Sequence, residues 1–249
     1  MSGRGLVPRQ LADHELGHVE VDPVLPEPLD HDGPHYRVAG ATTRTPPEPA
    51  PPVYFGGASA AAERVAARYV DVYLAWGEPP AMVSERLDRM RSLAAEAGRN
   101  LRFGIRFHVI TRPSAGSAWA IAEELLAGMD PTAVAAAQTD FAATMSEGQR
   151  RMASLHRGSP ADLEIHPNVW AGIGLVRGGA GTALVGSYEQ VADRIAEYHG
   201  LGFDEFILSG YPHLEEAYWF GEGVLPILRT RGLVAARADA SPAPVSTFR

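Results

Sequence analysis

The chain has 249 residues, no cysteine, and a formal net charge of −8, with 45% hydrophobic and 21% charged residues. Together with a mean hydropathy of −0.11, this composition indicates a soluble globular protein and excludes disordered, collagenous and membrane-spanning classes. The missing cysteines exclude disulfides and thiolate sites, the acidic balance argues against a nucleic-acid partner, and without an apolar signal segment we expect a cytoplasmic protein.

Residues 1–52 are predicted to form an irregular, proline-rich leader. Half of the 20 prolines of the chain lie there, ending in a run from Pro46 to Pro52 that cannot continue a helix or a central strand. His14-Glu15-Leu16-Gly17-His18 matches HExxH, in which two histidines bind zinc and the glutamate activates water. Because Pro23 follows closely and no third histidine comes at the metzincin spacing, we interpret the stretch as a solvated polar segment. A zinc hydrolase is the alternative.

Residues 53–230 are predicted to form one domain, followed by a polar tail over residues 231–249. Strand patterns are expected at residues 53–57, 70–76, 101–111 and 203–209, and helices at a stretch ending at 68 and at 81–97, 187–198 and 214–228. A largely helical tract from 117 to about 156 is too long for a simple connection and predicts an insertion. The alternation predicts an α/β fold with a parallel sheet, whose ligands bind at the carboxyl ends of the strands.

The first candidate site is the turn Gly57-Ala58-Ser59, which follows a strand and opens a helix. Its backbone N–H groups, the helix dipole and the Ser59 hydroxyl would converge on an anion such as a phosphate. The alternative is a tight turn in which Ser59 is only the N-cap of the helix.

The second candidate pair, Arg106 and His108, is two residues apart in the strand FGIRFHVI, so both side chains face the same side. If that side is the interior of a barrel, the buried arginine requires an anionic partner and the histidine can titrate near neutrality. The alternative is an edge strand with one solvated polar face.

Two further candidates lie nearer the C-terminus. Arg177 lies in the glycine-rich segment of residues 172–186, which is typical of a mobile loop that folds a cation over a ligand, or else of a flexible surface linker. Tyr211 and His213 flank Pro212 just beyond a strand. This arrangement places a phenol near a site, or is only a rigid entry to a helix.

Six segments together resemble the FMNH2-dependent alkanesulfonate monooxygenases of the bacterial luciferase-like superfamily. They are YFGGAS, DVYLAWGEPP, FGIRFHVI, QRRMASLH, PNVWAGIGLVRGGAGTALVG and FILSGYPHLEEAYWF. The resemblance covers residues 25–228 and implies a (β/α)8 TIM barrel. It also implies that this chain is N-terminally truncated, retaining the C-terminal half of the barrel: about four parallel strands with helices and a helical insertion. The active-site cysteine of the family would be lost with the other half.

The resemblance implies an enzyme that uses reduced FMN and O2 to convert an alkanesulfonate into an aldehyde and sulfite, in sulfur metabolism. A separate NAD(P)H-dependent FMN reductase would supply the FMNH2. Active-site positions of the family fall on Arg106, His108, Arg177, Tyr211 and Trp76. The FMN phosphate would meet Gly57, Ala58 and Ser59. No metal is expected.

Half a barrel would expose strand edges, which favours a homo-oligomer or completion by another chain. Two alternatives to the monooxygenase therefore stay open. One is a non-catalytic remnant or half-barrel subunit that needs another chain. The other is a different flavin or deazaflavin oxidoreductase of the luciferase-like superfamily.

Overall fold

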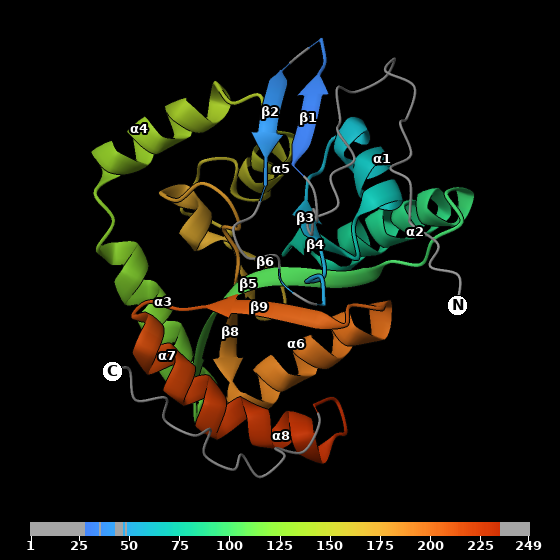
Figure 1. Cartoon of the computed structure of the whole chain (residues 1–249). Helices are drawn as coiled ribbons and strands as arrows, with labels where there is room; N and C mark the ends of the chain where they lie inside the picture. The colour runs from blue at the N-terminus through green and yellow to red at the C-terminus, as the bar shows by residue number, and fades with distance from the viewer. Residues whose placement is uncertain (1–27, 35, 43–46, 48, 235–249) are drawn as a thin grey trace, which may run out of the picture. The chain divides into compact units, whose positions relative to one another are not determined.

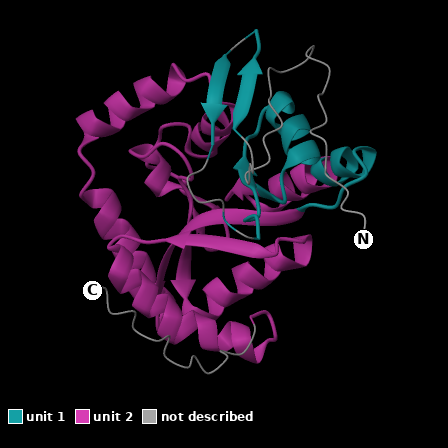
Figure 2. Cartoon of the chain, in the orientation of Figure 1, with its two compact units in different colours: residues 1–73, 90–101 teal, residues 74–89, 102–249 magenta. Residues whose placement is uncertain are grey.

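The computed structural model describes residues 28–34, 36–42, 47 and 49–234 (Figure 1). The chain divides into two compact units (Figure 2): unit 1 is residues 1–73 with 90–101, and unit 2 is residues 74–89 with 102–249. The HELGH stretch at residues 14–18 lies outside the described residues. Within them, no helix is long and apolar enough to cross a membrane.

The first described elements of unit 1 form an antiparallel hairpin of β1 (Leu29–Asp32) and β2 (Arg37–Ala41). Arg37 donates to Asp32 across the turn, with Nε–Oδ1 at 2.9 Å and Nη2–Oδ2 at 2.7 Å. The sequence predicted an irregular leader here, and over these strands it was wrong. Pro28 comes just before β1, and Pro34 lies in the turn between β1 and β2. Neither proline therefore interrupts a hydrogen bond between the two strands.

The predicted strand–helix–strand order follows in β3 (Tyr54–Gly56), α1 (Ala60–Tyr69) and β4 (Val72–Trp76). The Val53 carbonyl accepts hydrogen bonds from the N–H groups of Asp71 and Val72, at 2.9 and 3.1 Å. The Asp71 carboxylate in turn accepts from the Val53 N–H at 2.7 Å. These hydrogen bonds connect the start of β3 with the start of β4. The boundary between the two units passes through β4 and through α2 (Pro80–Glu96).

The centre of unit 2 is the long strand β5 (Arg102–Arg112). It pairs in parallel with β9 (Glu205–Ser209) over its first half and with β8 (Ala183–Ser187) over its second. On the far side of β8, β7 (Val169–Trp170) and then β6 (Glu164–His166) add antiparallel pairs. The sheet is therefore mixed and β5 is interior to it, so the interpretation of its Arg106–His108 face as that of an edge strand is wrong.

The tract predicted as helical over residues 117–156 is three helices in succession: α3 (Ala115–Ala127), α4 (Pro131–Ala142) and α5 (Glu147–His156). The N-cap residues of these helices are Ser114, Asp130 and Ser146, respectively. In each, a side-chain oxygen accepts a hydrogen bond from a backbone N–H in the first turn of the helix. The remaining helical segments are α6 (Tyr188–Leu201), α7 (His213–Trp219), the π-helical turn η2 (Phe220–Val224) and α8 (Leu225–Thr230).

Helix α3 packs against β5 and β8, and one apolar cluster fills the space between them. Its buried members are Ile110, Ala118, Ala122, Leu163, Trp170, Ile173, Leu175, Ala183 and Val185. The glycine-rich segment of residues 172–186 thus contains the 3-10 turn η1 (Gly172–Leu175) and the buried strand β8. The segment is therefore not one loop, and only the residues between η1 and β8, which include Arg177, form a loop. The glycine at its start serves close packing: a Cβ on Gly172 would lie 1.9 Å from the Trp170 ring.

Candidate active site

His108 occupies the position at which β5 changes partners. It is in register with Ser209, the last residue of β9, and with Ala183, the first residue of β8. The segment that leaves β9 and the segment that enters β8 therefore converge on this residue. The first carries Tyr211 and the second carries Arg177, which is why residues so distant in the sequence meet here.

The Arg177 guanidinium contacts the His108 ring directly, with Nη1 2.8 Å from Nε2. A guanidinium can only donate hydrogen bonds, so Nε2 of the neutral ring is the acceptor and its proton is on Nδ1. The Ala180 carbonyl oxygen lies 3.2 Å from the same Nε2. It can accept a hydrogen bond only when Nε2 carries a proton. The contact with Arg177 therefore selects one tautomer of His108.

Tyr211 stacks on the same imidazole, with ring centroids 5.2 Å apart and an interplanar angle of 20°. The His213 ring in turn contacts that of Tyr211, with ring centroids 5.4 Å apart. The peptide bond between Tyr211 and Pro212 is cis. His108 itself is 1% exposed. Burial, followed by the charges of Arg177 and Arg106, lowers the pKa of His108 to about 4. At neutral pH the ring is therefore uncharged.

The cluster carries positive charge, and no carboxylate of the described residues compensates it. In the part of the chain that the structure describes, neither Arg106 nor Arg177 forms an ion pair with Asp or Glu. Arg106 Nε and His108 Nδ1 are buried there without a hydrogen-bond partner. Buried donors without partners are rare in native proteins and are available to an acceptor from outside. Arg86, Arg194 and Arg229 also have a buried Nε without a partner, so the distinguishing feature here is the combination of such donors with two arginines that lack a carboxylate among the described residues. The cluster therefore has hydrogen-bond donors that could be used by an anion.

Trp76, the fifth predicted site residue, lies at the end of β4. A Cβ on Gly148 would be 3.0 Å from its Cζ3 atom, so the indole lies against the start of α5. The next residue, Gly77, links the strands below the cluster. It donates its N–H to the Arg106 carbonyl at 2.9 Å, and its carbonyl accepts from Thr182 Oγ1 at 2.7 Å.

Two glutamines that the sequence analysis did not single out hold the segment that carries Arg177. Gln149 on α5 accepts the Gly179 N–H at 2.8 Å, and Gln138 on α4 donates to the Leu175 carbonyl at 2.8 Å. No pattern distinguishes such a glutamine from any other on a helix. The QRRMASLH segment of the family resemblance was the one available signal, since Gln149 is its first residue.

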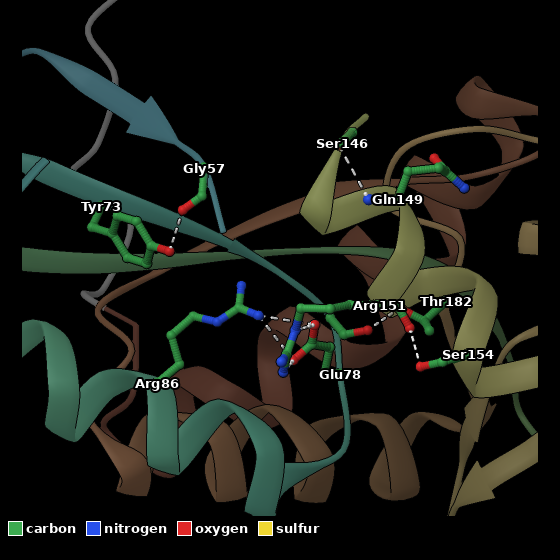
Figure 3. A network of polar contacts seen from close by, with 10 residues as sticks. Gly57, Tyr73, Glu78, Arg86, Ser146, Gln149, Arg151, Ser154 and Thr182 are labelled. Carbon is green, nitrogen blue, oxygen red and sulfur yellow. Dashed lines mark hydrogen bonds and ion pairs between the residues drawn. The ribbon is translucent and has the colours of Figure 1, made fainter. Parts of the chain in front are cut away.

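A second arginine pair surrounds a buried carboxylate (Figure 3). Arg151 from α5 donates to Glu78 through Nε at 2.8 Å and Nη2 at 2.6 Å, and Arg86 from α2 donates to both oxygens at 3.2 and 3.4 Å. Glu78 is 1% exposed. Tyr198 adds a hydrogen bond from its hydroxyl to the Glu78 carbonyl at 2.8 Å. This cluster fixes α5 to the segment after β4.

The Gly57–Ser59 turn belongs to unit 1 and is accounted for by local structure. Ser59 Oγ accepts the Ala62 N–H at 3.2 Å as the N-cap of α1, and the Gly57 carbonyl accepts from Tyr73 Oη at 2.6 Å. A Cβ on Gly57 would come within 2.6 Å of the Ala62 Cβ. The hydroxyl proton of Ser59 is still available to donate to an anion.

Comparison with known proteins places this geometry in a family. The sequence profile described as luciferase-like monooxygenase matches residues 15–205, well over half of the chain. The chain belongs to the luciferase-like monooxygenase family. The match begins ten residues before the range over which the resemblance was recognised, 25–228, and ends at the start of β9.

Solved structures of luciferase-like proteins share the fold. Riboflavin lyase RcaE, solved with modified FMN and riboflavin, is 25% identical, with a TM-score of 0.62 over 86% of this chain and 51% of that chain. DmoA from Hyphomicrobium sulfonivorans is 24% identical, with a TM-score of 0.63 over 83% and 47%. EDTA monooxygenase EmoA from Chelativorans sp. BNC1 is 23% identical, with a TM-score of 0.60 over 84% and 52%. The luciferase-like chain therefore spans about half the length of these proteins, and the prediction of an α/β fold matching half of a (β/α)8 barrel is confirmed.

Proposed function

We propose that this luciferase-like chain contributes to a flavin-dependent monooxygenase that converts alkanesulfonates to an aldehyde and sulfite. The observation that carries the proposal is the cluster of Arg106, His108 and Arg177, in which two guanidinium groups lack a carboxylate partner within the described residues. A sulfonate is an anion at every working pH and presents oxygens in the geometry that guanidinium groups recognise.

The residues of the cluster have separate roles in this proposal. Arg106 and Arg177 bind the sulfonate, and the Nδ1–H of His108 is left to donate a hydrogen bond to the bound anion or to the reacting oxygen. Tyr211 covers one face of the imidazole and excludes water from it. Because the pKa of His108 is lowered to about 4, the ring is a neutral donor at pH 7.

Reduced FMN would supply the electrons that activate O2, and we assign its phosphate to the turn of Gly57, Ala58 and Ser59. The Ser59 hydroxyl proton and the helix dipole of α1 suit this ligand. A separate NAD(P)H-dependent FMN reductase as electron source and a homo-oligomeric assembly belong to the same proposal.

The test is an anaerobic fluorescence titration of the full chain with reduced FMN, with and without an alkanesulfonate, followed by a sulfite assay with a flavin reductase and O2. Saturable FMN binding that sulfonate tightens, together with sulfite release, supports the proposal. Arg106→Met is the matched variant, because it removes one guanidinium without a described carboxylate partner and keeps the unbranched apolar stem of the side chain.

A different luciferase-like oxidoreductase is the second candidate, favoured by the 25% identity to a riboflavin lyase. The same titration with riboflavin and with a reduced deazaflavin in place of the sulfonate and FMN separates the two. Binding of riboflavin without binding of sulfonate would select the second candidate. Binding of neither ligand by folded protein would favour a subunit that needs another chain.

A further inference from the structure

The segment that carries Arg177 is a closed loop, residues 175–180, with a narrow neck. The neck is formed by Gly174, whose N–H donates to the Gly181 carbonyl at 2.9 Å. A Cβ on Gly181 would lie 2.5 Å from the Gly174 Cα, so the two backbone segments that form the neck are in direct contact. The ends of the loop are therefore fixed, and the direction of the Arg177 side chain depends on how the tip is held.

Gln149 holds that tip. Its Oε1 accepts the Gly179 N–H at 2.8 Å, two residues after Arg177. The glutamine is 7% exposed, and its Nε2 atom is buried without a partner in the described part of the chain. Gly179 has φ +90°, a conformation that glycine adopts without strain. Because the amide is buried, the hydrogen bond does not compete with water.

The helix that carries Gln149 is itself anchored. Two residues further on, Arg151 makes its paired hydrogen bonds to Glu78, and Gly148 lies against Trp76. Gln149 thus connects a helix fixed to the end of β4 with the tip of the Arg177 loop. Two residues before Gly179, Arg177 of the same loop donates a hydrogen bond to His108.

We infer that Gln149 is a positioning residue that, by holding the Gly179 N–H, directs the Arg177 guanidinium onto His108 Nε2 and so keeps the imidazole proton on Nδ1. The functional meaning of this tautomer rests on the proposed function, since Nδ1–H is the donor assigned there to the anion. The assignment of Gln149 itself rests only on the contacts of α5, the loop and β5.

The ionisable groups around His108 come from three directions. Arg106 lies two residues before it on β5, Arg177 comes from the loop, and Tyr211 and His213 come from the segment after β9. Of these, Arg177 alone has a hydrogen bond to the ring that depends on the loop. Loosening the loop tip would remove that bond and leave the other groups in place.

The test is a long-range 1H–15N NMR experiment on the full chain, which reports for each imidazole which nitrogen is protonated and at what pH the ring titrates. A His108→Gln variant assigns the signal. In the wild-type chain we expect an unprotonated Nε2 and titration at about 4. In Gln149→Met, which keeps the side-chain length, we expect a population protonated on Nε2 and a pKa displaced upward toward 6.5.

Two controls isolate the route through Arg177. Gln138→Met removes the glutamine that holds the base of the loop, and we expect it to leave the His108 tautomer unchanged. In an Arg177→Met background, Gln149→Met should have a smaller effect on His108 than in the wild-type background, because only the Ala180 carbonyl, 3.2 Å from Nε2, is then left in the loop to transmit it. Thermal unfolding of each variant verifies that the chain is folded.

Three outcomes would overturn the inference: a wild-type His108 protonated on Nε2, no change in Gln149→Met, or an equal change in Gln138→Met. The first is measured on the wild-type chain, with His108→Gln needed only to assign the signal, so a Gln149→Met chain that fails to fold leaves the inference testable. None of these measurements uses FMN or sulfonate. Absence of sulfite release with the expected tautomer would contradict the proposed function and leave the role of Gln149 intact.

Discussion

Unit 2 contains two arginine pairs that differ in one respect. Arg86 and Arg151 share the buried carboxylate of Glu78, which accepts from both guanidinium groups. Arg106 and Arg177 surround a neutral histidine and have no carboxylate partner among the described residues. The first pair has a carboxylate partner within the chain (the satisfied pair), whereas the second pair has none among the described residues (the unsatisfied pair). The comparison separates an arginine pair that holds the fold from one that is available to a ligand.

The largest effect should come from breaking the satisfied pair. Glu78→Gln leaves two guanidinium groups without their counter-charge, and removal of one partner from a buried ion pair destabilises a protein by about 3–5 kcal/mol. Urea unfolding of the variant measures the loss. A change below about 1 kcal/mol would mean that the Glu78 cluster behaves as a surface ion pair and that the contrast between the pairs is wrong.

The next effect is a pH dependence of stability that originates in His108, the histidine next to the unsatisfied pair. The pKa of His108 is about 4 in the folded chain and 6.5 in its ordinary state, so the unfolded chain binds more protons between these values. The free energy of unfolding should therefore fall as the pH drops from 6.5 toward 4, by at most about 3 kcal/mol for this shift of 2.5 pH units.

Urea unfolding at several pH values, compared between the wild-type chain and His108→Gln, isolates this contribution. The comparison is needed because burial also lowers the pKa of His156, which gives a slope of the same sign. Identical slopes for the two chains would show that His108 titrates normally.

Ligand binding distinguishes the two pairs directly. Arg106→Met should weaken sulfonate binding by about ten- to a hundredfold, the value of one hydrogen bond from a charged group, while leaving stability unchanged or higher. Arg86→Met is the matched control and should have the opposite profile, with lower stability and unchanged affinity in the chains that remain folded. Equal affinities of Arg106→Met and wild type would remove Arg106 from the anion site.

The smallest effect concerns the turn in unit 1. Ser59→Ala removes the N-cap of α1 and should cost about 1 kcal/mol of stability, measured by thermal unfolding. If the turn also holds the FMN phosphate, the variant should bind reduced FMN more weakly than a chain destabilised equally elsewhere. Unchanged FMN affinity would leave Ser59 with its capping role alone.

Local patterns were sufficient to predict several parts of the molecule. The alternation in FGIRFHVI placed Arg106 and His108 on one side of a strand, and the strand–helix order located Trp76 at the end of one strand and Tyr211 just beyond the end of another. These predictions depend on periodicity and on the parallel connection, both of which are local properties of the chain.

Contacts between distant segments could not be predicted in this way. Arg151 and Glu78 are 73 residues apart, and Gln149 and Gly179, which also meet, are 30 apart. The composition of residues 172–186 indicated flexibility, but its glycines allow backbone and ring contacts around β8. Flexibility and close packing need the same residue, so composition alone does not distinguish them.

The glycine neck at Gly174 and Gly181 also restricts how this family member can change over evolutionary time. A larger residue at Gly174 or Gly181 would push apart the two backbone segments that form the neck. The tip residues Val176 and Gly178, in contrast, are exposed. We therefore expect substitutions to be tolerated at the tip, where a new side chain can change the contacts with the anion without changing the backbone of the neck. A library randomised at the tip and constant at the neck would sample new ligands at little cost in folding.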